Sequence, residues 1–165
     1  MLLLKDLREF AEQHVKQRPN LEIVLVLGEE TEYSKNVRDV GNHDELMTLV
    51  LVMPTYDSRI SDEDNAEFGN NLYFMVVKNT DARDQSHKIE IFQKTQIEIL
   101  ALLRIMINLH KMNSMDIDSK PELLPYKDHV CLFNDIDLNS FRVDSVNNYH
   151  GTNGWEVEFT TETSL

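Results

Sequence analysis

Hydrophobic and polar positions follow two different periods along this chain. Between Leu3 and Gln17, apolar residues recur at steps of three and four with charged residues between them. This spacing predicts an amphipathic helix that ends before Pro19. Three shorter runs are apolar and rich in β-branched residues, which predicts buried strands. They are Leu21–Leu27, Leu46–Met53 (which we expect to end at Pro54) and Leu72–Lys78.

The segment Lys88–Met112 predicts the long helix around which the fold is organised. Most of its residues are Ile, Leu, Met or Phe, and its polar residues form a narrow stripe. We expect that stripe, which includes Glu90, Lys94 and Glu98, to face water, and we place Leu103 in the core opposite it. A helix that is apolar around most of its circumference needs cover on more than one side. We therefore expect it to pack on a sheet and also on a second element or a second subunit.

The remaining segments are shorter and more polar. Glu29–Glu45 indicates a long loop or a ragged hairpin, and the acidic stretch Thr55–Asn71 indicates a loop, because both combine charged residues with glycine and asparagine turn signals. The C-terminal part contains three short strand candidates. They are His129–Phe133, Ser140–Val146 and Trp155–Thr161, of which the last alternates between apolar and polar residues as a half-buried antiparallel strand does.

These elements predict one α+β domain over residues 1–165. Their order is helix, three strands, helix, then two or three strands. Because most strands follow one another without a helix between them, we expect an antiparallel or mixed sheet. Both main helices should lie on one face of that sheet.

Composition narrows the range of partners. The chain has 165 residues and a formal net charge of −13, with 16 Lys and Arg against 29 Asp and Glu. Such a negative charge favours solubility, binding to a basic partner, or the passage of a polyanion without binding. It argues against a surface that wraps DNA or docks on an anionic membrane. No apolar stretch has the length of a membrane span. The sequence has a single cysteine, Cys131, so an intrachain disulfide is excluded and a reducing cytoplasm is expected. Cys131 lies in a predicted strand, which indicates a buried, inert thiol.

No motif in the sequence indicates catalysis or metal binding. None of the six histidines pairs with another at the three- or four-residue spacing of a helical metal site. The acidic cluster between the second and third strands lacks the residue order of a calcium-binding loop. Phosphate-loop, dinucleotide and nucleophile-elbow patterns are missing as well. We therefore expect a protein that is not an enzyme and that carries no cofactor or metal.

Three features together resemble a known family. They are the element order, the central helix with TQIEILALLRIMINL, and the tail NNYHGTNGWEVEFTTETSL, in which an Asn- and Gly-rich turn leads into a Gly-Trp strand. In these features the chain is similar to the tail terminator and neck (tail completion) proteins of tailed bacteriophages. Proteins of that family form rings, commonly sixfold, that cap the tail tube and join it to the head connector. The polar stretch Glu29–Glu45 has no counterpart in that layout.

The resemblance implies a structural virion protein without catalytic residues that is assembled in the host cytoplasm. Its partners would be copies of itself in a ring, the tail tube and the neck or connector proteins. A strand-rich core would carry loops and a terminal arm that reach neighbouring subunits. DNA would pass nearby without specific binding.

Two other classes fit parts of the pattern. The element order and the acidity also resemble type III secretion chaperones, which are small acidic dimers that bind an unfolded effector segment. Those chaperones usually end in a third helix, whereas this chain ends in the strand-like WEVEFTTETSL. An enzyme whose active site has no recognisable motif is the third class.

Two kinds of residues are candidates for intermolecular contacts. Trp155, the only tryptophan, either packs in the core or anchors an interface. The acidic stretches either form solvated outer edges or line a channel, where negative charge would repel DNA and keep it centred. The acidic candidates are Glu29, Glu30, Glu32, Asp57, Asp62, Glu63, Asp64 and Glu67.

Overall fold

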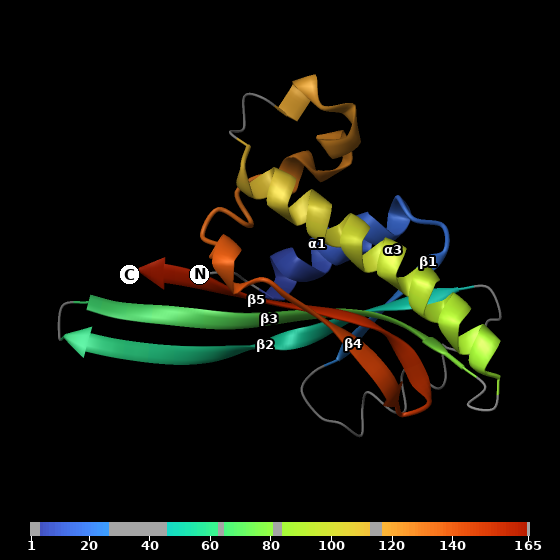
Figure 1. Cartoon of the computed structure of the whole chain (residues 1–165). Coiled ribbons are helices and arrows are strands. Elements are labelled where there is room, and N and C mark those ends of the chain that lie inside the picture. Colours follow the sequence, from blue (N-terminus) through green and yellow to red (C-terminus); the bar gives the residue numbers. More distant parts are fainter. Residues whose placement is uncertain (1–3, 27–45, 63–64, 81–83, 113–116, 165) are drawn as a thin grey trace.

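The structure is a computed structural model that describes residues 4–26, 46–62, 65–80, 84–112 and 117–164. It is an α+β fold with the predicted order of main elements (Figure 1). Those elements are α1 (Leu4–Lys16), β1 (Leu21–Val26), β2 (Met47–Asp62), β3 (Asn65–Asn79), α3 (Gln85–His110), β4 (Arg142–Tyr149) and β5 (Thr152–Ser164). Three short 3-10 helices lie between α3 and β4, namely η1 (Ile117–Ser119), η2 (Pro121–His129) and η3 (Leu138–Ser140).

The strands form one mixed sheet in the order β1-β2-β3-β5-β4. β1 runs parallel to β2, with Leu21 opposite Met47, and the other three neighbouring pairs are antiparallel. The last strand of the chain therefore lies inside the sheet, between β3 and β4. The expectation of a mixed or antiparallel sheet is confirmed.

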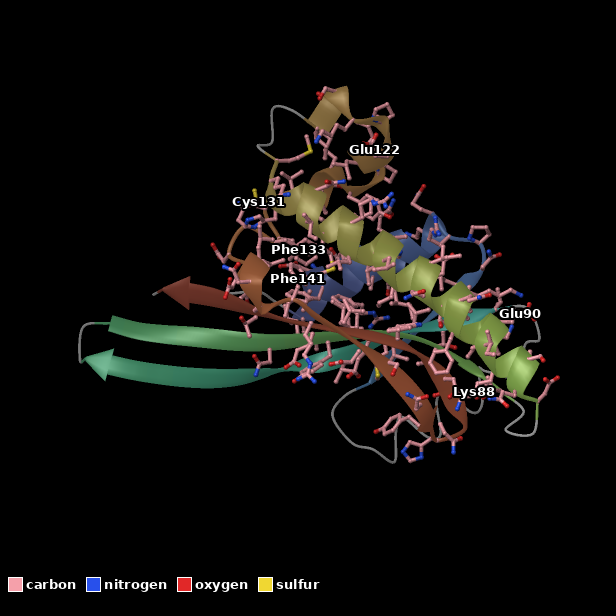
Figure 2. All side chains as sticks on the ribbon, viewed as in Figure 1. Lys88, Glu90, Glu122, Cys131, Phe133 and Phe141 are labelled. Carbon is pink, nitrogen blue, oxygen red and sulfur yellow. The ribbon has the colours of Figure 1, made fainter. Side chains whose placement is uncertain are left out.

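Both main helices pack on the same face of the sheet, as the sequence predicts (Figure 1). The ring of Phe10 in α1 lies 4.7 Å from that of Phe133 and 6.4 Å from that of Phe74 on the sheet. Phe133 and Phe141 lie between the helices and the sheet (Figure 2). Fully buried aromatic rings supply much of the apolar area that holds such a layer together. α3 contributes Ile99, Leu102, Met106 and Leu109 to the same core.

The helix α3 is unbroken over 26 residues, which confirms the predicted long helix. Asp84 caps its start, because the Asp84 carboxylate accepts a hydrogen bond from the backbone N–H of His87 at 3.0 Å. The prediction of its polar stripe is right at Glu90 and Lys94, which are exposed and form an ion pair at 2.5 Å. It is wrong at Glu98, which is only 6% exposed.

The core side of α3 is therefore rotated from the predicted one. Leu103, which we place in the core from the sequence, is only partly buried, whereas its neighbour Leu102 is fully buried. Arg18, beyond the end of α1, provides a partner for Glu98 and so allows this carboxylate to enter the core. The side of a helix on which a polar residue is tolerated depends on whether a partner elsewhere in the fold can pair with it. The spacing of apolar residues in the sequence does not reveal that partner.

The acidic stretch Thr55–Asn71 is not a loop, which corrects the prediction. β2 continues through Pro54 to Asp62, and β3 begins at Asn65, so most of the stretch is a hairpin. The strand register shifts between Val52 and Thr55, around Pro54, whose nitrogen has no hydrogen to donate to the ladder. The prediction failed because its polar residues resemble a turn signal. Strand pairing through the backbone does not by itself require the alternation of apolar and polar residues by which strands are recognised in a sequence.

The segment between α3 and β4 also differs from the prediction in one place. His129–Phe133 is not a strand, because η2 ends at His129 and turns follow it. Val130 and Phe133 are buried three residues apart, which is the spacing of a helical turn. Cys131 lies between them and is exposed, so the expectation of a buried thiol is wrong. The later strand predictions are confirmed, since Ser140–Val146 overlaps β4 and Trp155–Thr161 lies within β5.

Candidate interaction surfaces

A three-stranded arm carries part of the predicted acidic surface. We define the arm as residues 55–62 of β2, 65–71 of β3 and 160–164 of β5, which pair with one another. The hairpin of β2 and β3 extends beyond the main helices (Figure 1), while Ser140 and Ile136 contact Thr160 and Thr161 at the base of the arm. Asp57 and Asp62 lie in β2 of the arm, and Glu67 lies in β3. The other acidic candidates, Glu29, Glu30, Glu32, Glu63 and Asp64, lie outside the described residues.

The outer edge of the arm is open in the part of the chain that the structure describes. β1 pairs with β2 only from Met47 to Val52, so beyond Val52 no described strand lies beside β2 on that side. An unpaired strand edge presents backbone N–H and C=O groups that can pair with another chain. The arm is thus a surface suited to backbone contacts with a neighbouring molecule.

The side chain of Trp155 is held in place by contacts within the molecule. Its indole N–H donates to the backbone carbonyl of Phe92 at 2.9 Å, and the two rings meet edge to face at 6.1 Å. Trp155 is half-buried and joins β5 to the first half of α3. Its packing role is therefore visible, while its predicted role at an interface stays a prediction.

A partly buried ion pair joins Arg18, just beyond the end of α1, to Glu98 in the middle of α3. Arg18 donates through Nε and Nη2 to the two carboxylate oxygens of Glu98 at 2.7 and 2.8 Å. The hydrogen bond from Arg18 to Glu98 is the main reason that the pKa of Arg18 is raised. A bidentate interaction of this kind pairs the two charges and also fixes the relative position of the two helices. Sequence reasoning misses this pair because its members are far apart in the chain and Glu98 fits a solvent-facing stripe.

His14 belongs to the core and is electrically neutral at pH 7. Its Nδ1 lies 2.9 Å from the hydroxyl oxygen of Tyr126, and its ring stacks on Phe10. Burial first, and the positive charge of Arg18 second, lower the pKa of His14 to about 4. Burial also raises the pKa of Tyr126 to about 12. His14 is buried and so is not placed to meet a reactant, which agrees with a structural role.

A groove of about 500 Å³ lies on the face of the sheet opposite the helices. The hydroxyl of Tyr73 donates to Glu158 at 2.6 Å, which raises the pKa of Tyr73 to about 12. Burial, followed by the neighbouring carboxylates, raises the pKa of Glu156. The mixture of apolar side chains, hydroxyls and one carboxylate suits an extended segment of protein better than a small charged ligand. The groove is lined by Val52, Tyr73, Met75, Ser145, Val146, Asn147, Tyr149 and Glu156.

Among the residues that the structure describes, no group of three or more His, Cys, Asp or Glu side chains is arranged to hold a metal ion. Over the same ranges, none of the helices is both long enough and apolar enough to cross a membrane. The chain matches no protein-family model, no curated protein and no solved structure.

Proposed function

We propose that this protein is a structural subunit that acts by assembling with copies of itself, as a ring-forming component of a tailed-phage neck or tail end. The observation that carries the proposal is the arm. Its three strands are fully paired with one another out to the contacts of Asp62 with Asn65 and of Glu67 with Ser164. This extension agrees with the subunit-contacting arm that the resemblance to tail terminator proteins implies.

The physical argument rests on what stabilises such an arm. A strand that projects beyond the core buries little apolar surface, and short isolated hairpins are only marginally stable in water. An arm of this kind gains stability when its open edge or its faces meet a neighbouring subunit. The tip of the arm lies far from the first turns of α3 (Figure 1), so a contact of the tip with the helical face of a neighbour would join two different surfaces. Repeated contacts between different surfaces generate rings when the rotation closes.

The acidic residues of the arm suggest a role for its tip. In a ring around DNA, carboxylates that face the channel repel the duplex because both are negatively charged, and they offer none of the cationic contacts through which a basic surface binds phosphates. β2 ends at Asp62, so the tip carries acidic residues. Replacing Asp62, Glu63 and Asp64 with Lys should leave assembly intact and slow the passage of DNA. Unchanged packaging and ejection in that variant would place the tip on the outer wall.

A shortened arm tests the proposal directly. Replacing residues 57–69 with Asn-Gly joins Tyr56 to its cross-strand partner Asn70 through a two-residue turn. Native mass spectrometry and negative-stain microscopy should show rings for the full chain and none for the shortened chain. Circular dichroism checks that the shortened chain still folds, and Leu124→Lys, a change at an exposed position outside the arm, serves as the matched control. Rings from the shortened chain, or no rings from the full chain, contradict the proposal.

The secretion-chaperone alternative has one observation in its favour, the groove between β2, β3, β4 and β5, which an extended effector segment could fill. Glu156→Lys changes the charge at the groove without touching the arm. Loss of binding to an unfolded segment in that variant, with no ring in the full chain, would favour the chaperone.

A further inference from the structure

The outward side of α3 exposes large apolar residues. Ile97 is 62% exposed, Ile89 is 54% exposed and Leu100 is 45% exposed. The opposite side of the same helix packs into the core through Leu102 and Met106. Exposed apolar residues that gather on one side of a helix mark a contact surface more often than scattered ones do.

The spacing of these residues is that of a helix-pairing seam. Ile89, Gln93, Gln96, Leu100, Leu103 and Ile107 follow one another at alternating steps of four and three. This is the spacing of the a and d positions in a heptad, which form a continuous line toward a second helix. Gln93 and Gln96 are exposed, while Leu103 and Ile107 are half-buried, so most of the seam is accessible. We name these six residues the outer seam.

The charges beside the outer seam are complementary to those of a second, antiparallel copy. Such a copy places Ile89 opposite Ile107 of the second chain and Gln96 opposite Leu100. Ile97, the most exposed of the large apolar residues, flanks the seam and lies near its own equivalent beside the twofold axis. Glu90 and Arg104 flank the seam on the same side, offset by two residues from the seam pairs, so Glu90 lies near Arg104 of the second chain, and both side chains are exposed. Arg104 forms no ion pair with any residue that the structure describes, so it is available for this contact.

We infer that α3 pairs antiparallel with α3 of a second copy, through the outer seam and with Ile97 beside the twofold axis. The contact joins identical surfaces and closes at two subunits. It lies on the helical face of the molecule, whereas the hairpin of the arm extends beyond the main helices (Figure 1). Figure 2 shows Glu90 near the first turns of α3, with its side chain at the surface. The inference does not depend on the proposed function, because a dimer through α3 forms with or without a ring.

The test compares the mass of the full chain in solution with that of seam variants, by light scattering and sedimentation over a range of concentrations. The full chain should dimerise, and Ile97→Lys should weaken the dimer by about a hundredfold, because two ammonium groups meet beside the axis. Leu124→Lys, at an exposed apolar position outside α3, should leave the dimer unchanged. Circular dichroism establishes that each variant keeps its fold.

The register has its own test. Glu90→Arg and Arg104→Glu should each weaken the dimer by about tenfold, and the double variant should restore it, because the two charges exchange places across the axis. In a Cys131→Ser background, Ile97→Cys should form a disulfide-linked dimer on mild oxidation, while Leu124→Cys should not. A monomeric full chain, or a dimer that survives Ile97→Lys, overturns the inference. A larger ring that Ile97→Lys leaves intact also overturns it, while it supports the arm contact.

Discussion

Lowering the pH should destabilise the fold through His14. This side chain is 1% exposed and its pKa in the folded protein is about 4, against about 6.5 in an unfolded chain. Between these two values the unfolded chain binds the proton that the folded protein rejects. The stability contributed by neutral His14 is therefore complete above pH about 6.5 and is lost as the pH falls toward about 4.

The size of the effect follows from the two pKa values. Proton linkage over this interval removes about 2 kcal/mol from the free energy of unfolding at pH 5, and about 3 kcal/mol once the pH is below 4. The cause is local, because Tyr126 and Phe10 enclose the ring and Arg18 adds a repulsive positive charge. A loss of about 2 kcal/mol is a large part of the stability of a typical small domain.

Urea unfolding of the native sequence and of His14→Gln, at half-unit steps from pH 8 to pH 5, measures this contribution. Glutamine keeps a group that can form a hydrogen bond with the Tyr126 hydroxyl, but it does not titrate. The pH-dependent contributions of the other histidines and of the carboxylates are the same in both proteins and therefore cancel in the difference between their free energies of unfolding. The difference in free energy of unfolding should shrink by about 2 kcal/mol between pH 8 and pH 5. A difference that stays constant across this range would refute the assignment of His14 as a buried neutral histidine.

Two further predictions concern other buried positions. Arg18→Met leaves the Glu98 carboxylate buried without its partner and should lower the free energy of unfolding by about 3 kcal/mol. The double variant with Glu98→Met should recover most of that loss. Equal losses in the single and double variants would contradict the pairing of these two side chains. Gly154→Ala should lower the free energy of unfolding by about 3 kcal/mol or prevent folding, because a Cβ there would lie 2.0 Å from the carbonyl oxygen of Val76. If the variant unfolds at the same temperature as the native sequence, β3 and β5 can move apart and the prediction is wrong.

The sequence predicts well those elements whose period reflects burial. α1 buries one face, which gives it the helical spacing of apolar residues, and the strand around Trp155 alternates. The apolar part of β2 is buried on both faces, which gives a continuous apolar run. The hairpin of the arm is missed because its sequence is polar and shows neither the apolar run nor the alternation that predicts a strand. The turn at Cys131 is misread because Val130 and Phe133 are apolar in a short run, where the periods of a strand and of a helical turn cannot be told apart.

The candidate surfaces were predictable only in part. The acidity of Asp57, Asp62 and Glu67 is plain from the sequence, but their position on a strand-paired arm depends on the long-range pairing of β3 with β5. The Arg18–Glu98 pair depends in the same way on how α1 packs against α3. Contacts between residues far apart in the chain are set by the whole fold, and a local pattern does not contain them.

The two sides of α3 differ in how their polar and apolar residues are covered, and this difference supports the inferred pairing with a second copy. Its core side includes two polar residues, and each is satisfied inside the molecule. The hydroxyl of Thr95 donates to the Ile91 carbonyl at 2.7 Å, and Glu98 is held by Arg18. Its outer side meanwhile leaves Ile97 largely exposed. Burying an ion pair is costly unless its geometry is good, whereas burying an isoleucine is favourable by about 2 kcal/mol. A partner that covers Ile89, Ile97 and Leu100 removes large apolar side chains from water, which is the free-energy gain that the inferred pairing of α3 with a second copy would use.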